Sequence, residues 1–426
     1  MPPINTVIAK PSVSLPATNT IFTRPIGPLS TTEIIVTNAA ELTNAIKGVK
    51  GGETILLAPG DYGNFAFAKA APSLVTIKSL DPNNDAVFHS LKLTRAENFR
   101  IEDVDVRNVQ DAGFQDKAIF INASNNISLF GVDVTGSLDG NASNDGYGAY
   151  IGYSKNISVL NSTFSQVHIG VVAGVVDNLK VAGNDISEAR EGVVVSSING
   201  GLFDRNYLHD MQAKPGDHAD FFQVHNGGAA VSSNNLTFTN NVMIQGAGGR
   251  DIQGIFIFNE KGAQGARHTN IVVENNFYEG AALNAVSVSY VNNATVRDNT
   301  VLYSGNSVFN LMPAVYVNHV TNGVVADNIG SIILERGGTS NIGVTWTNNV
   351  DVWDPKFKKG IALSDVFAPP PASGEINFSN LEARANGAAA GLGFHSVEGI
   401  GHMGSGSIAS LAAHVPYQDG LWALHI

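Results

Sequence analysis

The segment NLKVAGN, residues 178–184, begins and ends with asparagine and encloses a short run with a β-branched residue. The same six-residue spacing between asparagines recurs at Asn235–Asn241, Asn270–Asn276, Asn293–Asn299 and Asn322–Asn328, and looser copies begin at residues 98, 126, 156, 200 and 341. Neighbouring copies start 19 to 35 residues apart, which is the length of one coil made of three short strands and three turns. The repeat predicts an all-β fold, a parallel β-helix of about ten or more coils. The second asparagine of each copy is expected in a turn, stacked on its equivalents and bonded to backbone groups.

The overall composition of the 426-residue chain agrees with a solenoid and excludes several other classes. Hydrophobic residues make up 43% of the chain and charged residues 15%, which is enough to bury a large core. The 45 glycines indicate many tight turns. A net charge of -12 argues against general nucleic-acid binding, and no apolar run is long enough for a membrane span. The chain contains no cysteine, so thiolate chemistry is excluded.

Three regions differ in composition. Residues 1–32 are rich in proline and threonine and are expected to form an extended arm; the first twenty lack a basic region followed by an apolar one, so the chain shows no Sec signal peptide. Residues 33–368 contain the repeats and are assigned to the β-helix. Residues 369–426 begin with three prolines and continue rich in glycine, alanine and serine, which suggests either a C-terminal cap or a homo-oligomer contact.

A second pattern predicts which side chains face the core. A small residue stands eight positions before the first asparagine of most copies, and these anchor positions are Ala118, Gly148, Gly170, Gly192, Ala285 and Ala314; in the two longest coils the best matches are Asp220 and Gly254. Residues one and three positions after the anchors are almost all apolar, so we expect them inside the coil. The anchors and the residues two positions away from them are then expected to face solvent.

These features resemble the pectate-lyase-like superfamily of right-handed parallel β-helices. The resemblance includes Ala39–Gly63, AAELTNAIKGVKGGETILLAPGDYG, which is similar to that superfamily's N-terminal cap helix and first strand. A helix there would cover the open end of the core. Because the superfamily contains lyases, hydrolases, epimerases and phage tailspikes, the resemblance implies a fold and a glycan ligand but no single reaction.

Most of the charged, histidine and aromatic residues predicted for the outer face lie on the coils between residues 168 and 260. His168, Arg190 and His218 are expected to form a basic ladder two positions before the anchors, and Asp220 is the only charged anchor. Two long loops add further polar residues to the same side, and insertions on one face of a solenoid commonly mark its binding side. The residues predicted to contact substrate are His168, Phe222, Phe256, Arg250, His225, Glu260, Lys261 and Tyr316.

Two cleavage reactions fit these residues. In β-elimination on a uronate-containing polysaccharide, Arg190 would neutralise the sugar carboxylate, His218 would remove the C5 proton, and Asp220 would orient His218. In hydrolysis, two carboxylates among Asp217, Asp220 and Asp251 would act as a pair. The basic ladder favours elimination. No cofactor is required by the sequence, although the same three aspartates offer oxygen ligands for calcium.

Two further alternatives remain open. Proton return to the opposite face of the sugar would make the protein a uronate C5-epimerase. A non-catalytic phage fibre or adhesin would bind glycan without cleaving it. For all of these the expected partner is a polysaccharide, most simply an anionic one, and the expected location is extracellular or virion-associated.

Overall fold

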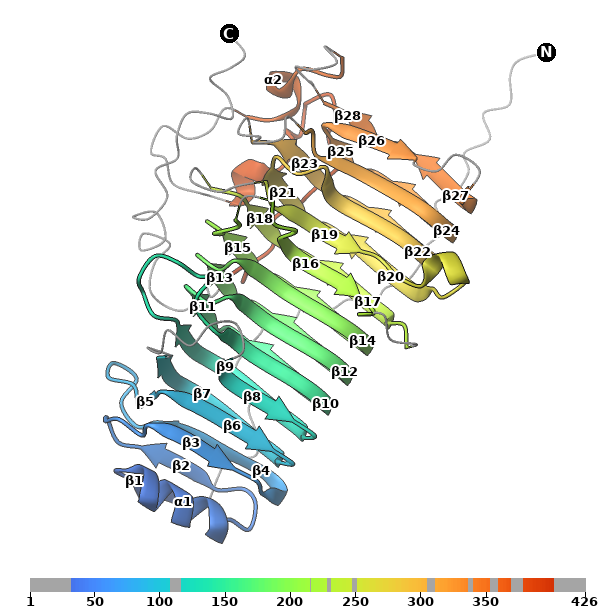
Figure 1. Ribbon diagram of the computed structural model, residues 1–426. Helices are drawn as coiled ribbons and strands as arrows, with labels where there is room; N and C mark the ends of the chain where they lie inside the picture. Colours follow the sequence, from blue (N-terminus) through green and yellow to red (C-terminus); the bar gives the residue numbers. More distant parts are fainter. Residues whose placement is uncertain are drawn as a thin grey trace, which may run out of the picture.

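The chain winds into a long parallel β-helix, whose strands stack from the N-terminal helix at one end to β28 at the other (Figure 1). The computed structural model describes residues 32–107, 116–214, 216–227, 231–246, 251–304, 311–335, 340–352, 359–368 and 378–401. Every pairing between its named strands is parallel, and each coil contributes to three sheets, which we call sheet one, sheet two and sheet three. The predicted β-helix is therefore confirmed.

Sheet one carries the candidate functional residues. It consists of β3 (Asn64–Phe67), β6 (Ser90–Thr94), β8 (Lys117–Asn122), β16 (Asp220–His225), β19 (Gln253–Ile257), β26 (Ile332–Glu335) and the first halves of β10 (Tyr147–Leu160), β12 (Ile169–Ala182), β14 (Glu191–Asp204), β22 (Asn284–Arg297) and β24 (Ala314–Ala326).

Sheets two and three complete the tube. Sheet two contains the second halves of those five long strands, the first parts of β7 (Glu97–Arg107) and β9 (Asn125–Thr135), and β1 (Glu33–Val36), β2 (Thr54–Leu57), β4 (Ala70–Ser79), β17 (Asn234–Thr239), β20 (His268–Glu274) and β27 (Ile342–Thr347). Sheet three contains the ends of β7 and β9 with β5 (Val87–Phe88), β11 (Thr163–Ser165), β13 (Asp185–Ser187), β15 (Tyr207–His209), β18 (Val242–Ile244), β21 (Phe277–Gly280), β23 (Thr300–Tyr303), β25 (Ile329–Gly330) and β28 (Val350–Asp351).

The predicted cap helix is present as α1 (Ala39–Gly48), at the open N-terminal end of the tube (Figure 1). Asn38 caps it by accepting a hydrogen bond from the backbone N–H of Glu41, whose carboxylate accepts one in return from Thr37. Leu42 and Ile46 on its inner face are buried in the main core. The helix therefore shields apolar side chains of the first coil that water would otherwise reach.

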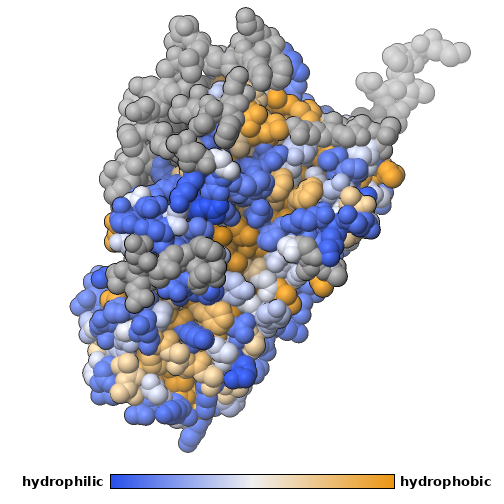
Figure 2. All heavy atoms as spheres, in the orientation of Figure 1, coloured by the Kyte–Doolittle hydropathy of each residue, from blue (hydrophilic) through white to orange (hydrophobic). Residues whose placement is uncertain are grey.

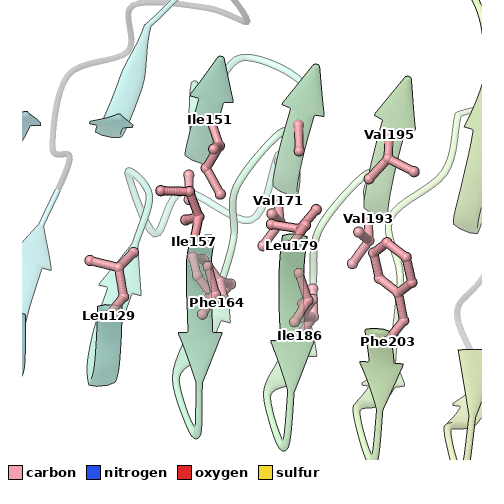
Figure 3. Close-up of a cluster of buried hydrophobic side chains, with 14 of the residues drawn as sticks. Leu129, Ile151, Ile157, Phe164, Val171, Leu179, Ile186, Val193, Val195 and Phe203 are labelled. Carbon is pink, nitrogen blue, oxygen red and sulfur yellow. The ribbon is translucent and has the colours of Figure 1, made fainter. Parts of the chain in front are cut away.

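The core is a continuous stack of aliphatic and aromatic side chains from all three sheets. Figure 3 shows consecutive coils, in which Val171, Leu179 and Ile186 from one coil point into the same interior as Val193 and its neighbours from the next. Each residue sits above its equivalent in the adjacent coil, since Val171 pairs with Val193 and Leu179 with Gly201. Stacking of equivalent positions at the spacing of a parallel sheet, about 4.8 Å, gives the tube its length.

The asparagine repeats form two different ladders. The second asparagines, Asn184, Asn206, Asn241, Asn276, Asn299 and Asn328, are fully buried, and each amide group donates to the next one at 2.8–3.0 Å. The first asparagines, such as Asn178 with φ 57°, take the left-handed backbone conformation that asparagine tolerates well. The predicted structural role of the repeat is thus confirmed. The asparagines of the buried ladder stack on one another and bond to backbone groups, as expected.

The register predicted for the anchor positions is wrong in one respect. Tyr147 pairs with Ile169 and Ala149 pairs with Val171, but Gly148 between them is not part of this register. The alternation of faces along the strand is therefore interrupted at Gly148. A Cβ added to Gly148 would lie 2.6 Å from a ring carbon of buried Phe164, so the anchors face the core and must be small. The residues just before the anchors then face outward.

A second error concerns the fifth of the anchor-bearing coils. Val193 pairs with Phe222, not Phe221, so Phe221 and not Asp220 occupies the anchor position. Phe222 therefore lies in the core, fully buried, and its prediction as an outward substrate-binding ring is wrong. Gln223, expected inside, faces outward and reaches His218.

The described part of the C-terminal region packs against the outside of sheet three. It includes α2 (Leu363–Val366), η3 (Phe378–Leu381) and the segment up to residue 401. Phe367, Phe394 and Ile400 are buried there in a second apolar cluster with Phe277 and Tyr207. The residues of the predicted arm before 32, and those at 369–377 and 402–426, lie outside the described residues. An oligomer contact by the C-terminal segment stays a prediction.

Candidate active site

Six polar side chains meet on the outer face of sheet one, at the strands β12, β14 and β16 and the loop before β16. They are His168, Arg190, Glu191, Asp217, His218 and Asp220, and we call them the polar cluster. Five of them were predicted from the sequence; Glu191 was not. They come together because the two residues before an anchor lie at the outer face, and the loop after β15 folds back over that face.

Arg190 is the centre of the polar cluster. Its guanidinium forms ion pairs with Glu191 and with Asp217, and its Nη1 lies 3.4 Å from Nε2 of His168. The ion pairs with both carboxylates raise the pKa of Arg190 above its usual value despite burial. Burial and the neighbouring positive charge lower the pKa of His168, so that imidazole is neutral near pH 7.

His218 and Asp220 form a pair in which only the histidine meets solvent. Nδ1 of His218 lies 3.1 Å from Oδ2 of Asp220, and their side chains are 57% and 0% exposed. The hydrogen bond to Asp220 raises the pKa of His218. Burial raises the pKa of Asp220 to about 6, and its second oxygen has no hydrogen-bond partner among the described residues. With Nδ1 facing the carboxylate, Nε2 is the ring nitrogen directed away from the pair.

Glu191 and Asp220 face outward from adjacent coils, at equivalent positions. Ile169 pairs with Glu191 and Gln253 pairs with Asp220, which places all four residues in one column just before the anchors. Burial is the main reason that the pKa of Glu191 rises to about 7, and the charges of Asp220 and Asp217 add to it. Two neighbouring carboxylates whose pKa values lie near neutrality are unusual outside functional sites.

The predicted ladder of three basic residues is only partly correct. His168 and Arg190 occupy equivalent positions on neighbouring coils, but the next member of their column is Ala219, because the register on that coil differs by one residue. His218 lies one residue before Ala219 and joins the cluster through Asp217, whose Oδ1 accepts its backbone N–H at 3.1 Å. The three basic side chains therefore lie in one cluster without forming a straight ladder.

The remaining predicted site residues are spread over the neighbouring coils. Phe256 packs its ring edge-on against His218, with ring centroids 5.0 Å apart. His225 and Glu260 form a separate pair at 3.5 Å, and Lys261 is exposed in the turn before η1 (Gly262–Gln264). Tyr316 is buried and donates to Asn284 at 2.6 Å. Arg250 lies outside the described residues.

The structure gives limited support for a calcium site at Asp217, Asp220 and Asp251. Asp217 already pairs with Arg190, and Asp220 with His218. Asp251 is half-buried at the start of the next coil, two residues before Gln253. Among the described residues, no group of three or more acidic or histidine side chains is arranged to hold a metal ion. To bind Asp217 and Asp220, calcium would have to displace Arg190 from the first and His218 from the second. The calcium site stays a prediction.

No helix in the described part of the chain has the length and apolar character needed to cross a membrane. No curated protein matches the sequence.

Several solved structures share the architecture. The PL6 family alginate lyase AlyGC is 12% identical, with a TM-score of 0.48 over 91% of this chain and 59% of its own, so this chain spans about three fifths of that lyase. A PL6 family polysaccharide lyase from Pseudopedobacter saltans is 14% identical, with a TM-score of 0.41 over 81% of this chain and 98% of its own. The GH136 lacto-N-biosidase from Eubacterium ramulus is 10% identical, with a TM-score of 0.43 over 75% and 67%.

With TM-scores below 0.5, these structures assign neither the fold nor a function to this chain. The family model described as "Right handed beta helix region" matches residues 90–264, a stretch that includes the whole polar cluster. With the three stacked sheets of the structure, this match confirms the fold expected from the sequence: the protein is a right-handed parallel β-helix.

Proposed function

We propose that the protein is a carbohydrate-active enzyme that cleaves an acidic, uronate-containing polysaccharide by β-elimination at the polar cluster. The observation that carries the proposal is the pair of His218 and Asp220, an exposed imidazole held by a fully buried carboxylate. Such an arrangement fixes the ring and leaves one nitrogen available to take a proton. An outer face that extends over many coils suits an elongated ligand.

In this mechanism Nε2 of His218 removes the C5 proton of the uronate. The electrons of the C5–H bond form a C4=C5 double bond, and the C4–O bond breaks to release the neighbouring sugar, whose oxygen takes up a proton. Asp220 stabilises the imidazolium that forms, because its carboxylate lies 3.1 Å from Nδ1. The proton leaves more easily when the sugar carboxylate is neutralised.

Arg190 is the group that supports this neutralisation. Its charge is balanced by Glu191 and Asp217 in the structure. Because the pKa of Glu191 is about 7, this carboxyl group is partly protonated near neutral pH. When Glu191 is protonated, Asp217 alone balances the charge of Arg190, and the other N–H groups of the guanidinium can donate to a sugar carboxylate. Phe256 beside His218 offers an apolar surface for the sugar ring.

Hydrolysis is the second candidate, and the raised pKa of Glu191 favours it. A carboxyl group with a pKa of about 7 is suited to protonate a leaving oxygen. Asp220 on the adjacent coil is fully buried, so it acts on this carboxyl group through its charge and does not contact the sugar. This acid differs from the aspartate pairs predicted from the sequence, since Asp217 is held by Arg190. C5-epimerisation uses the same first step as elimination and differs in where the proton returns.

The test is incubation with alginate, polygalacturonate and gellan. Elimination creates a conjugated double bond that absorbs in the ultraviolet, whereas hydrolysis releases reducing ends without this absorbance. Binding of a glycan without any new chain ends would instead indicate a phage fibre or adhesin, which the sequence left open. An extracellular or virion-associated location follows from the proposed substrate and belongs to the same proposal.

A further inference from the structure

A group of lysines and aromatic rings lies on the outer face of sheet one, on the coils before the polar cluster. It consists of Lys92, Lys117, Phe120, Tyr147 and Tyr150, and we call it the lysine–aromatic track. Figure 2 shows the same face of the molecule as Figure 1, where both hydrophobic and hydrophilic residues reach the surface.

The rings of the track are stacked with their planes nearly parallel. Phe120 and Tyr150 pair on neighbouring coils, with centroids 5.6 Å apart and planes 12° from parallel. Tyr147 lies 6.4 Å from Tyr150 at 16°. All three are half-buried and outside the core, which is filled by the residues between them, such as Ile119 and Ala149. The parts of these rings that reach solvent form an apolar surface against which the C–H groups of a sugar can pack.

Both lysines hold their ammonium groups over these rings. The Nζ atom of Lys92 lies 5.3 Å from the centroid of Phe120, and that of Lys117 lies 5.4 Å from Tyr150 and 5.7 Å from Tyr147. The whole chain has 37 acidic and only 25 basic residues, so two lysines beside three rings are a local exception to its charge. Together they offer a surface of stacked rings with positive charge beside it, which matches a carboxylated sugar.

The track continues directly into the polar cluster. The rings of Tyr147 and His168 are 6.0 Å apart, and His168 in turn contacts Arg190. Tyr147 also occupies the same outward column as Glu191 and Asp220, through Ile169. From β6 to β16 there are five coil steps, which at about 4.8 Å each amount to roughly 24 Å. That length accommodates several sugar units in a row.

We propose that the lysine–aromatic track binds the portion of an anionic oligosaccharide that extends from the polar cluster toward the N-terminal end of the β-helix. The rings pack against the C–H groups of the sugars, and Lys92 and Lys117 pair with sugar carboxylates. The glycan then lies along the helix axis, and longer chains bind more tightly than short ones. This assignment rests on the proposed function for its ligand class, although binding at the track does not require cleavage at the cluster.

The parent for the experiment is the full chain with His218→Ala, in which no turnover interferes with binding. It is compared with the double variant that also carries Lys92→Met and Lys117→Met. Binding of alginate and polygalacturonate hexasaccharides is measured by calorimetry at two salt concentrations, with a neutral hexasaccharide as a further probe. Methionine keeps most of the apolar stem and removes the charge. Lys155→Met, at an exposed lysine of β10 outside the track, is the matched control.

We expect the double variant to bind the acidic hexasaccharides about tenfold more weakly and with less salt dependence. Lys155→Met should bind like the parent, and affinity for the corresponding disaccharides should change little. Tyr150→Ala should also weaken hexasaccharide binding, since it removes part of the stacking surface. Equal affinity of parent and double variant for every acidic hexasaccharide that binds would overturn the track.

The outcomes separate the two proposals. If the wild-type protein cleaves a substrate but the track variants bind it normally, the track is wrong and the active site stands. If no substrate is cleaved while track-dependent binding is present, the track stands and the proposed cleavage is wrong. Failure of the acidic hexasaccharides both to bind and to be cleaved would contradict both.

Discussion

Nδ1 of His218 lies 3.1 Å from Oδ2 of Asp220, and the loop before β16 leaves the imidazole exposed while it buries the carboxylate completely. The pair therefore combines a group that water and substrate can reach with one that neither can reach. The roles of the exposed imidazole and of the buried carboxylate can therefore be tested by separate substitutions.

Replacing His218 with alanine should reduce the turnover of an acidic polysaccharide by about 10²–10⁴-fold, which is the usual contribution of a positioned acid or base. The fold should persist because the side chain is 57% exposed. Initial rates and a far-ultraviolet circular dichroism spectrum would check both points. The matched control is His89→Ala, which removes the exposed partner of Asp61 in a similar pair at 3.0 Å on the first coils. Full activity of His218→Ala would refute its role as the base.

The pH dependence distinguishes the two candidate reactions. A basic His218 must be unprotonated, and Asp220 raises its pKa, so the rate of elimination should rise as the pH passes above 6.5. Asp220→Asn removes the carboxylate charge, so the same rise should shift to lower pH. Hydrolysis with Glu191 as the acid would instead decline as the pH rises above about 7. Profiles of kcat/KM for the wild type and Asp220→Asn would check this, and an identical midpoint in both would count against the pair.

Glu191→Gln provides a product-level test of the same alternatives. Glutamine keeps the shape of the side chain and can still meet Arg190, but it can neither donate a carboxyl proton nor carry a negative charge. If the reaction is elimination, the unsaturated product should persist, with a KM that changes more than kcat. If the reaction is hydrolysis with Glu191 as the acid, release of reducing ends should decrease by about 10²-fold or more. Mass spectrometry of the products separates the two results.

The buried asparagine ladder should be essential for stability. Asn241 donates to Phe203 O at 3.0 Å and to the side chain of Asn276 at 2.9 Å, while its oxygen accepts from Asn206. Asn241→Ala leaves these buried groups without partners, and we expect it to destabilise the fold by about 2–4 kcal/mol. Asn270→Gly is the control, because it keeps the left-handed backbone and removes only an exposed side chain. Urea midpoints should fall for the first variant and remain nearly constant for the second.

His209 should make stability depend on pH. It is buried in sheet three between Asp185 and Asp210, at 3.1 and 2.6 Å, and these two partners outweigh burial and raise its pKa to about 9. A raised pKa in the folded state means that this stabilisation is complete below pH 6.5 and is lost as the pH rises through about 9. The difference corresponds to about 3 kcal/mol. Thermal melts between pH 6 and pH 10 should show the decline, and it should be smaller in His209→Gln.

The sequence predicted the fold well because the repeat reports backbone geometry directly. Asn178 and its equivalents mark left-handed turns, and Asn184 and its equivalents mark buried turns, so both positions are restricted to few residue types. The cap helix was also predictable, since Asn38 and Glu41 form a capping pair before an apolar stripe.

The candidate site was predicted less completely, because a shift of one residue exchanges the faces of a strand. Asp220 was aligned with Gly192, although Phe221 holds that position in the structure. The error moved Phe222 to the outside. Glu191 was missed because the residue before each anchor was not read as an outward column; its polarity next to Gly192 was the available signal.

The segment that ends at Gly401 returns along the molecule and bonds to coils far earlier in the chain. His395 donates its backbone N–H to Asn275, 120 residues away, and Gly401 donates to Arg205. Solenoids commonly gain or lose modules at an end, since each repeat contacts only its neighbours. Here an inserted or deleted coil between Arg205 and the C-terminal segment would break these pairings. The contacts of the C-terminal segment therefore fix the number of coils in that half of the protein.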